Sequence, residues 1–332
     1  MGKIKRKRPR RGSLQYWPRK RAKRIYPRIR NWPHKKDTKL LGFAGYKAGM
    51  TSVIFVDNRP KSSTKGEEIK KPVTIIEVPP LKAIAIKLYG KSYNGLKILG
   101  EVWAEKLDKE IARKLTLPKK RKTTLANLKE KLSDAEEIRV LACTQPKLTG
   151  FGKKKPEIME FAIGGEDVKA QFEYASSILS KEILVSDVFK EGELLDIHAI
   201  TIGKGFQGVI KRFGIRLQSH KAEKGRRKLA TLGPWTPKHV PWWTPQAEQM
   251  GFRTRTEYNK QLLKIGKSKE TPITPKSGLS HYGKVKSQYV LVAGSVPGPK
   301  KRLIRFTHAM RPKKGAHTQP PEITHISLGA QN

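Results

Sequence analysis

The sequence predicts a mainly β protein with an α/β insertion, a basic N-terminal arm and a long extended loop. Three observations lead to this prediction. Short stretches of alternating apolar and polar residues occur towards both ends of the chain, separated by glycine, proline and asparagine turns. Lysine and arginine are concentrated outside a neutral central block. A long segment after residue 212 lacks apolar periodicity and is rich in arginine, lysine, glycine, proline and tryptophan.

The overall charge of the chain predicts a nucleic-acid partner. The 332 residues include 71 lysines and arginines against 28 acids, a net charge of +43. Each phosphate that such a chain neutralises releases counterions and adds affinity. Because no apolar run reaches membrane length and no hydrophobic signal region is present, we expect a soluble intracellular protein. The single cysteine, Cys143, excludes an internal disulfide and a cysteine-based metal cluster.

The positive charge is distributed unevenly along the chain. Residues 1–36 carry sixteen lysines and arginines and no acid, whereas residues 101–200 carry eighteen of each sign. Residues 201–267 carry fifteen bases and three acids, and residues 268–332 carry eleven and two. The central block therefore has the charge balance of an ordinary soluble domain, whereas the rest suits a polyanion.

Residues 1–36 are predicted to form an RNA-binding arm. Nothing in this stretch predicts a packed core, and four prolines keep the backbone extended. Trp17, Tyr26 and Trp32 are interleaved with arginines, and such rings and guanidinium planes stack on bases while the charges meet phosphates. The alternative is a disordered solubilising tail or a localisation signal. The candidate RNA-binding residues of the arm are Arg10, Arg11, Trp17, Arg19, Lys20, Arg21, Arg24 and Arg28.

Residues 37–89 are predicted to begin a β-barrel or sandwich, which residues 186–212 and 283–332 complete. The spacing of the turns predicts short strands throughout, with a polar loop at 61–71. The expected strands lie at 40–47, 51–56, 72–78, 82–89, 194–202, 285–293, 303–307 and 322–328.

Residues 90–185 are predicted to form the α/β insertion. The pattern indicates two strands, at 137–144 and 158–163. Helices are expected at 107–115, 124–132 and 167–179, with a basic loop at 118–122. The simplest interpretation of these helices is structural.

Gly203, Gly205 and Gly208 form a G-x-G-x-x-G pattern directly after a predicted strand. A dinucleotide site would need a helix that opens at the third glycine and an acid about twenty residues later. The following residues are instead basic and interrupted by another glycine, and Glu223 is the only acid between positions 208 and 248. We therefore interpret these glycines as a backbone that a polyanion approaches closely. The candidate phosphate ligands beside them are Lys204, Lys211 and Arg212.

Residues 213–282 are predicted to form the extended basic loop. A proline every three or four residues across 232–245 excludes a helix or a central strand, and holds the chain extended at roughly 3 Å per residue. A loop this long depends on another molecule for its order. A short helix is expected at 256–265, with Thr256 as its N-cap and Gly266 after its last residue. The candidate RNA-binding residues are Arg226, Arg227, Lys228, Trp235, His239, Trp242, Arg253 and Arg255.

The tryptophans at 235, 242 and 243 have two interpretations, a local aromatic cluster or packing into nucleic acid. His239 either donates to RNA or has no special role, and His198, on a strand, is interpreted as a structural histidine. The histidines show no metal-ligand spacing, and neither a G-x-S-x-G motif nor a Walker motif occurs. We expect no enzymatic activity, cofactor, metal site or small-molecule substrate.

Residues 189–212 resemble the signature of the large-subunit ribosomal protein L3 family. Residues 11–14 and 18–21 resemble the N-terminal arm of that family, and residues 41–51 its first barrel strands. The 90–185 insertion is similar to the long archaeal and eukaryotic form rather than the bacterial one. The positions that match the signature are Phe189, Asp196, Ala199, Thr201, Gly203, Lys204, Gly205, Gly208 and Arg212.

This resemblance implies a six-stranded β-barrel of the translation-factor type, from which an arm and a loop run into large-subunit ribosomal RNA. It implies a loop-tip tryptophan, Trp235 by position, near the aminoacyl-tRNA side of the peptidyl transferase centre. Eukaryotic members carry a histidine, methylated in some, twelve residues earlier, where this chain has Glu223, so that modification is not carried over to this chain. The implied role is structural, in assembly of the cytoplasmic ribosome, with ribosomal RNA and neighbouring ribosomal proteins as partners.

Two other functions compete with this interpretation. A free RNA or DNA chaperone would have no use for a long proline-stiffened loop, because single-strand binders use grooves and stacking platforms. An RNA-modifying enzyme would need a cofactor pocket or an acid–base constellation, and the sequence shows neither.

Overall fold

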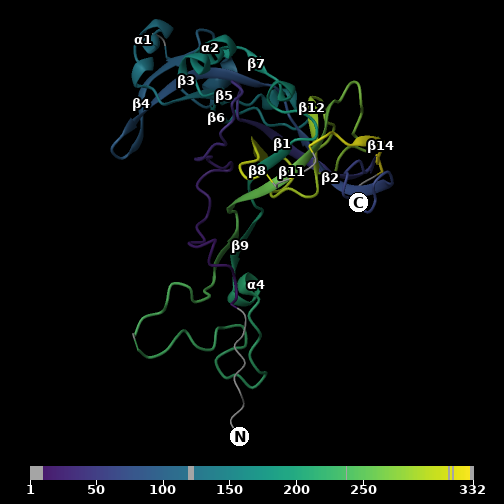
Figure 1. Cartoon of the computed structure of the whole chain (residues 1–332). Helices are drawn as coiled ribbons and strands as arrows, with labels where there is room; N and C mark the ends of the chain where they lie inside the picture. Colours follow the sequence, from purple (N-terminus) through teal and green to yellow (C-terminus); the bar gives the residue numbers. More distant parts are fainter. Residues whose placement is uncertain (1–9, 119–122, 237, 313–314, 316–317, 330–332) are drawn as a thin grey trace. The chain divides into compact units, whose positions relative to one another are not determined.

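The computed structural model describes residues 10–118, 123–236, 238–312, 315 and 318–329, and the chain divides into two compact units (Figure 1). The arm-and-loop unit comprises Met1–Arg24 and Ile200–Thr254, and the sheet unit comprises Ile25–Ala199 and Arg255–Asn332. Residues 1–9 of the predicted arm, 119–122 of the predicted basic loop and position 237 lie outside the described residues. No helix in the described part of the chain is long and apolar enough to cross a membrane.

The sheet unit contains a seven-stranded sheet with the order β13-β8-β11-β12-β2-β1-β14. β13 also pairs with β1, so six of these strands form a closed ring of pairings and β14 extends β1. The strands are β1 (Gly42–Val56), β2 (Glu68–Glu77), β8 (Leu194–Ile200), β11 (Thr254–Lys267), β12 (Gln288–Ala293), β13 (Leu303–His308) and β14 (Glu322–Ile326).

β1 is one continuous strand, whereas the sequence predicts two strands at 40–47 and 51–56. Its register with β2 shifts between Lys47 and Gly49. This bulge accommodates the residues that suggested a turn, because an extra residue bends a strand without ending its pairing.

A second, five-stranded sheet has the order β4-β3-β5-β6, and β7 pairs with β3. The strand predicted at 82–89 belongs to this second sheet. The sequence placed it in the barrel with β1 and β2, which is wrong. β4 is missing from the predictions, although Asn94-Gly95 at its start is a strong hairpin signal. The strands are β3 (Leu81–Ser92), β4 (Gly95–Trp103), β5 (Glu137–Cys143), β6 (Ile158–Ala162) and β7 (Glu182–Ile183).

α2 (Val168–Ile178) confirms the helix predicted at 167–179, and it contacts β3 and β5. The side chain of Asp167 caps it by accepting a hydrogen bond from the backbone N–H of Lys169 at 3.0 Å. The other two predicted helices are shorter than expected, because each buries only one residue and so has little apolar face. The short helical segments are the 3-10 helices Lys109–Arg113, Leu132–Asp134 and Pro146–Leu148, with α1 (Leu125–Lys129) and α3 (Val185–Val188).

The two sheets share one apolar core. Phe43 and Tyr46 of β1 belong to the same buried cluster as Phe161 of β6. The hydroxyl of Tyr46 donates to Oγ1 of Thr144, beyond the end of β5, at 2.9 Å. The prediction of a mainly β fold is therefore confirmed, with the longest helix packed on the second sheet.

The helix predicted at 256–265 is wrong, because this segment is part of β11. Leu262 is fully buried and pairs with Val292 of β12. Gly266 suggested a helix end, but a Cβ at this position would lie 2.4 Å from the ring of Tyr289. The glycine makes room for that ring, and pairing with a neighbouring strand outweighs the local signals for a helix.

Residues 25–36 belong to the sheet unit, so the expectation that nothing before residue 37 enters a core is wrong. Trp32 packs against the shared core. Nη1 of Arg305, on β13, donates to the carbonyl of Pro27 at 3.2 Å. The Arg305 guanidinium lies 5.7 Å from the ring centroid of Trp32 and 4.9 Å from that of Phe161. Burial lowers the pKa of Arg305 to about 9.

We predict that deletion of residues 1–24 leaves the sheet unit intact, whereas deletion of residues 1–36 destabilises it. The longer deletion removes Trp32 and the carbonyl of Pro27, which accepts from a buried cation. Because Trp32 is only partly buried, Trp32→Ala should lower the free energy of unfolding by about 2 kcal/mol, below the usual value for a core tryptophan. Urea unfolding followed by circular dichroism measures the effect. Equal stability of the two truncated chains would show that this anchor contributes nothing.

Candidate nucleic-acid interface

The arm-and-loop unit is almost purely cationic. Its sequence contains twenty-three lysines and arginines against two acids, Glu223 and Glu248. Like charges at this density repel one another unless an anion neutralises them. Any stable structure within the unit therefore needs contacts that tolerate charge.

A two-stranded antiparallel ribbon lies in this unit, formed by β9 (Gly203–Gln207) and β10 (Glu248–Gly251). Phe206 stands opposite Gln249, and Gln207 stands opposite Glu248. The ribbon leads directly into a short helix, α4 (Val209–Phe213). All three charged candidates around the glycine motif, Lys204, Lys211 and Arg212, therefore lie on regular structure.

The expectation that no helix opens at Gly208 is wrong, because Gly208 is the N-cap of α4. The helix nevertheless has only five residues, and Gly214 ends it in the left-handed region with φ 64°. β9 pairs antiparallel with β10, whereas a dinucleotide fold requires parallel strands joined by a crossover helix. The glycine pattern is therefore not a nicotinamide site.

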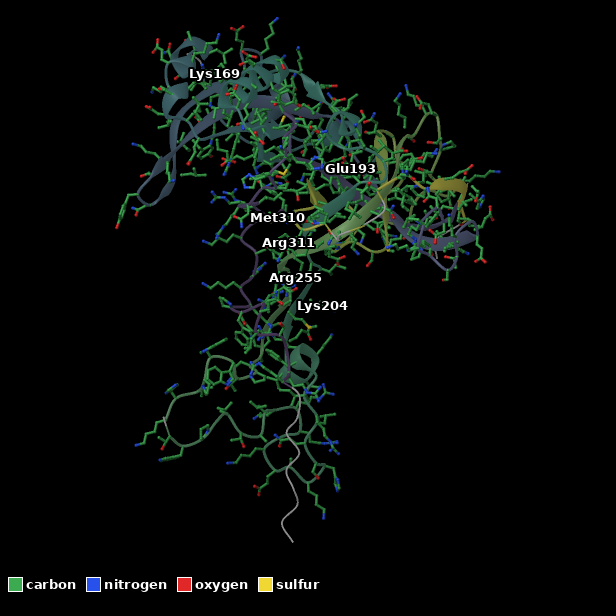
Figure 2. All side chains as sticks on the ribbon, in the orientation of Figure 1. Lys169, Glu193, Lys204, Arg255, Met310 and Arg311 are labelled. Carbon is green, nitrogen blue, oxygen red and sulfur yellow. The ribbon has the colours of Figure 1, made fainter. Side chains whose placement is uncertain are left out.

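Arg212 is engaged within the protein. Its side chain is 6% exposed, and its guanidinium lies 2.6 Å from the carboxylate of Glu248. Nη1 also donates to the carbonyl of Gln246 at 2.7 Å, so Arg212 fastens α4 to the start of β10. Lys204, labelled in Figure 2, and Lys211 remain exposed.

The arm packs against α4 through Arg19. Its guanidinium lies 4.4 Å from the ring centroid of Trp17 and 4.8 Å from that of Phe213. Gly12 has φ +77°, and a Cβ there would lie 2.4 Å from Nη2 of Arg19. Sequence reasoning did not identify Gly12 and Phe213 as partners of Arg19, because these contacts join residues that are far apart in the chain or have no local pattern. Stacking on rings lets a cation pack without a carboxylate partner.

The two interpretations of the tryptophans apply to different residues. Trp242 makes edge contacts with Trp17 of the arm at 5.2 Å and with Trp243 at 5.4 Å between ring centroids. Arg10 adds a hydrogen bond to the carbonyl of Trp243 at 3.1 Å. Trp235 stands apart from this cluster, with 83% of its surface exposed and Lys238 at 6.0 Å from its ring centroid. The local cluster thus includes Trp242 and Trp243 but not Trp235.

The described residues between Gly214 and β10 contain no helix or strand, yet they do not form one extended run. They fold into two loops, seen in the teal and green part of the ribbon in Figure 1. Gln218 closes the first, since its Nε2 donates to the carbonyl of Lys228 at 3.0 Å. Thr244 closes the second, since its Oγ1 donates to the carbonyl of Leu232 at 3.2 Å. The proline spacing gave no signal for these polar closures.

The candidate residues from the sequence fall into three groups by burial. Arg253 is buried, whereas Trp17, Arg19, Arg212 and Arg255 are partly buried. Arg28 and Arg255 lie in the sheet unit, and all others lie in the arm-and-loop unit. The exposed candidates are Arg10, Arg11, Lys20, Arg21, Arg24, Arg28, Lys204, Lys211, Arg226, Arg227, Lys228, Trp235, His239 and Trp242.

His198 is satisfied structurally, as the sequence suggests. Its Nδ1 lies 2.9 Å from the hydroxyl of Thr256, and its Nε2 lies 3.2 Å from that of Thr307. Burial, with a smaller effect from Arg305, lowers the pKa of His198 to about 4. The ring is therefore neutral at pH 7 and links neighbouring strands.

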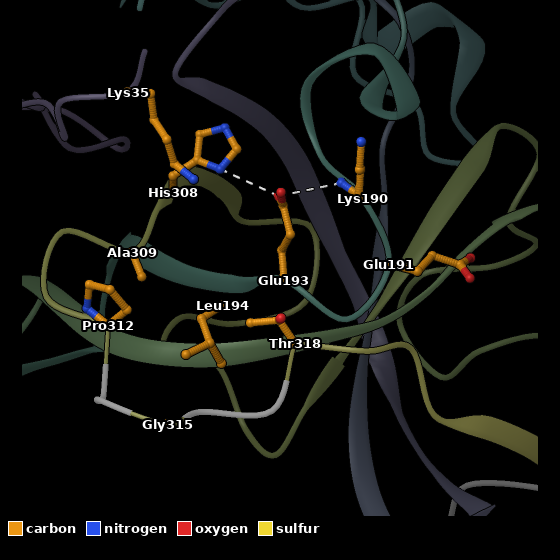
Figure 3. A pocket seen from close by; sticks show the side chains of 10 residues that line it. All are labelled: Lys35, Lys190, Glu191, Glu193, Leu194, His308, Ala309, Pro312, Gly315 and Thr318. Carbon is orange, nitrogen blue, oxygen red and sulfur yellow. Dashed lines mark hydrogen bonds and ion pairs between the residues drawn. The ribbon is translucent and has the colours of Figure 1, made fainter. Parts of the chain in front are cut away.

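A histidine–carboxylate pair, His308 and Glu193, lies in the sheet unit. Figure 3 shows His308 and Glu193 at a hollow of about 520 Å³, with Nδ1 3.4 Å from the carboxylate. Burial raises the pKa of Glu193, but the hydrogen bond and charge of His308 outweigh it, so the pKa lies below its usual value. Phe189 packs on the His308 ring at 4.6 Å between centroids. The pair joins the start of β8 to the end of β13. This structural role accounts for the pair, so no catalytic role is needed to explain it.

No group of three metal-ligating side chains gathers closely enough to hold an ion in the part of the chain that is described. Cys143 is buried, and burial raises its pKa to about 11, so its thiol is not a reactive thiolate.

Comparison with known proteins gives the family. The profile of the family described as Ribosomal protein L3 matches residues 1–327. The chain belongs to the ribosomal protein L3 family. It is 52% identical over 324 residues to the large ribosomal subunit protein uL3 of Archaeoglobus fulgidus, covering 96% of this chain and 97% of that protein. The uL3 proteins of Methanocaldococcus jannaschii (50% over 327 residues, 96% of each chain) and Methanopyrus kandleri (49% over 330, 98% and 91%) are similar.

Membership of the L3 family confirms the resemblance found at residues 189–212. The family consists of structural, non-enzymatic proteins, which agrees with the prediction that the chain is not an enzyme.

Arg212 and its neighbouring lysines should respond differently to mutation. We predict that Lys204→Ala and Lys211→Ala each reduce the salt dependence of RNA binding by about one phosphate, a slope change of about 0.7–0.9, with unchanged melting temperature. Arg212→Ala should instead destabilise the chain by about 1–2 kcal/mol, because it frees α4 from β10.

Binding of a large-subunit RNA transcript at several salt concentrations, together with thermal unfolding, separates the two effects. Arg216→Ala, at an exposed arginine after α4, is the matched control for loss of charge alone. If Arg212→Ala kept the parental melting temperature and reduced the salt dependence of RNA binding, Arg212 would instead be a phosphate ligand.

Proposed function

We propose that this protein is a structural component of the large ribosomal subunit that binds its ribosomal RNA and supports subunit assembly. The observation that carries the proposal is the separation of charge. Twenty-three bases and two acids gather in the arm-and-loop unit, whereas residues 101–199 of the sheet unit carry equal numbers of bases and acids. Membership of a family whose relatives are named large ribosomal subunit proteins supports the ribosome as the site of action.

The two units have different roles in this proposal. The closed ring of six paired strands serves as a translation-factor-type barrel, and it shares its apolar core with the second sheet. The arm-and-loop unit has few buried apolar residues, and its exposed cations meet phosphates of the RNA. The protein acts in the cytoplasm, on the ribosome, with neighbouring ribosomal proteins as further partners.

A free RNA chaperone remains the alternative function. It would use the same cations, but it would not travel with ribosomal particles. Sedimentation of the tagged full-length chain in a cell extract therefore tests the proposal. We expect the chain in the large subunit and the intact ribosome, and its release only when the subunit is dismantled. A chain that stays near the top of the gradient would contradict the ribosomal role.

Trp235 is proposed to brace the RNA near the aminoacyl-tRNA side of the peptidyl transferase centre. Its exposure of 83% supports this role, because little of its surface is used within the protein. Trp242 differs, since it packs against Trp17 and Trp243. RNA performs the chemistry, and the tryptophan positions it.

We predict that Trp235→Ala leaves the melting temperature within about 1 °C of the parent and permits subunit assembly, because no core contact is lost. The rate of peptide-bond formation or the binding of aminoacyl-tRNA should fall, since small shifts of positioned groups change rates greatly. Purified ribosomes that carry the variant are compared with the parent in both assays. Trp242→Ala is the matched control and should weaken the packing of the arm on the loop. If both ribosome assays gave parental values, the proposal that Trp235 braces this RNA would be wrong.

A further inference from the structure

Phe206 is an exposed aromatic residue of the β9–β10 ribbon. It stands on β9 with 74% of its surface exposed. Other phenylalanine rings of this unit contact arginines. The ring centroid of Phe213 lies 4.8 Å from the guanidinium of Arg19, and that of Phe252 lies 5.5 Å from the guanidinium of Arg21. No ring–ring or cation–ring contact found among the described residues involves Phe206. A single exposed apolar residue is common on protein surfaces, so its exposure alone does not identify a site.

The backbone on both sides of Phe206 gives a second observation. Gly208 is in extended conformation with φ −67°, which any residue adopts, and a Cβ there would meet nothing within 4 Å. As the N-cap of α4, this position would favour serine or asparagine over glycine. Nothing within the described protein therefore requires a glycine at 208. Gly205, with φ +66°, also borders open space.

The open backbone and the exposed ring together leave room for a flat group. A ring of 74% exposure offers its π face, and the absence of side chains at Gly205 and Gly208 lets another molecule approach the strand closely. Nucleobases are flat and stack on aromatic side chains irrespective of sequence.

The surrounding charge identifies the class of partner. Lys204, two residues before Phe206, and Lys211, on α4, are both exposed. The unit carries twenty-three bases against two acids, which repels a basic protein partner and attracts a polyanion. An unpaired nucleotide of RNA presents a flat ring next to a phosphate. The ring matches the exposed face of Phe206, and the phosphate matches the exposed lysines beside it.

We propose that Phe206 stacks on an unpaired nucleobase of the large-subunit RNA, while Lys204 contacts an adjacent phosphate. This inference rests on the proposed function. It adds a contact with a base to the phosphate contacts that the proposed function already assigns to the exposed cations. Removal of one stacked base lowers affinity about 5- to 150-fold. Because the ring neutralises no phosphate, its loss should leave the salt dependence of binding unchanged.

Four variants of the full-length chain test this proposal, with a large-subunit RNA transcript as the probe at several salt concentrations. Phe206→Ala and Phe206→Leu should both bind about 5- to 150-fold more weakly at unchanged salt slope, because leucine lacks a flat π face. Phe206→Tyr should bind like the parent. Gly208→Ser should weaken binding without lowering the melting temperature, since serine is a better N-cap but fills the open space.

Lys204→Ala is the control, because it should change the salt slope that the Phe206 variants preserve. Ultraviolet crosslinking of the parental complex, followed by mass spectrometry, should place a nucleotide on Phe206. Parental affinity of Phe206→Leu together with weak binding of Phe206→Ala would indicate an apolar contact, such as one with a protein, and overturn stacking. Parental affinity of Phe206→Ala would also overturn it. Failure of the parental chain to bind the transcript would instead overturn the proposed function itself.

Discussion

The sheet unit depends on a buried guanidinium, that of Arg305. It lies where the two sheets meet the segment before residue 37. Arg305 stands on β13, and its nitrogens donate to the carbonyls of Pro27 and of Glu160 on β6. The rings of Trp32 and Phe161 flank it at 5.7 and 4.9 Å. A charge buried in this way is costly unless every contact around it forms, and burial accordingly lowers its pKa to about 9. These contacts of Arg305 therefore link the two sheets and the segment before residue 37 to one another.

The arm-and-loop unit solves the opposite problem, because it has an excess of charge and little apolar surface to bury. Its arginines act as packing residues. Arg19 lies between the rings of Trp17 and Phe213, and Arg212 is held by Glu248 and the carbonyl of Gln246. A guanidinium plane stacks on an aromatic face while its edge still donates hydrogen bonds, which an ammonium group does less well. Some of the cations that a charge count assigns to RNA are thus used to build the unit itself.

Periodic apolar patterns predicted most of the strands and the longest helix, because burial on one face fixes the pattern of residues. The failures come from long-range contacts. The segment at 256–265 carries helix signals, but Leu262 pairs with Val292, and Gly266 is needed for the ring of Tyr289. Trp32 reads as part of a charged arm, and only its neighbours in space, Arg305 and the shared core, show that it is anchored.

Composition and motif spacing gave the candidate interface its location but not its internal structure. Lys204 and Arg212 belong to the same motif and carry the same charge, yet one is exposed and the other bound to Glu248. That difference depends on a residue thirty-six positions away, so no local pattern reports it. The same holds for Trp242, whose ring partner Trp17 comes from the arm.

The contacts within the arm-and-loop unit bear on the proposed binding of RNA. The sequence suggests a loop that only RNA can order, whereas Trp17 packs on Trp242 and the hydroxyl of Thr244 closes the loop from Leu232. A segment that is ordered before binding loses less conformational entropy on binding, and so retains more of its contact energy as affinity. The groups that the unit leaves exposed, including Lys204, Phe206 and Trp235, are then held on a preformed framework rather than on a free chain. In the proposed function, stacking and phosphate contacts at these positions therefore select a defined RNA geometry, which charge alone cannot do.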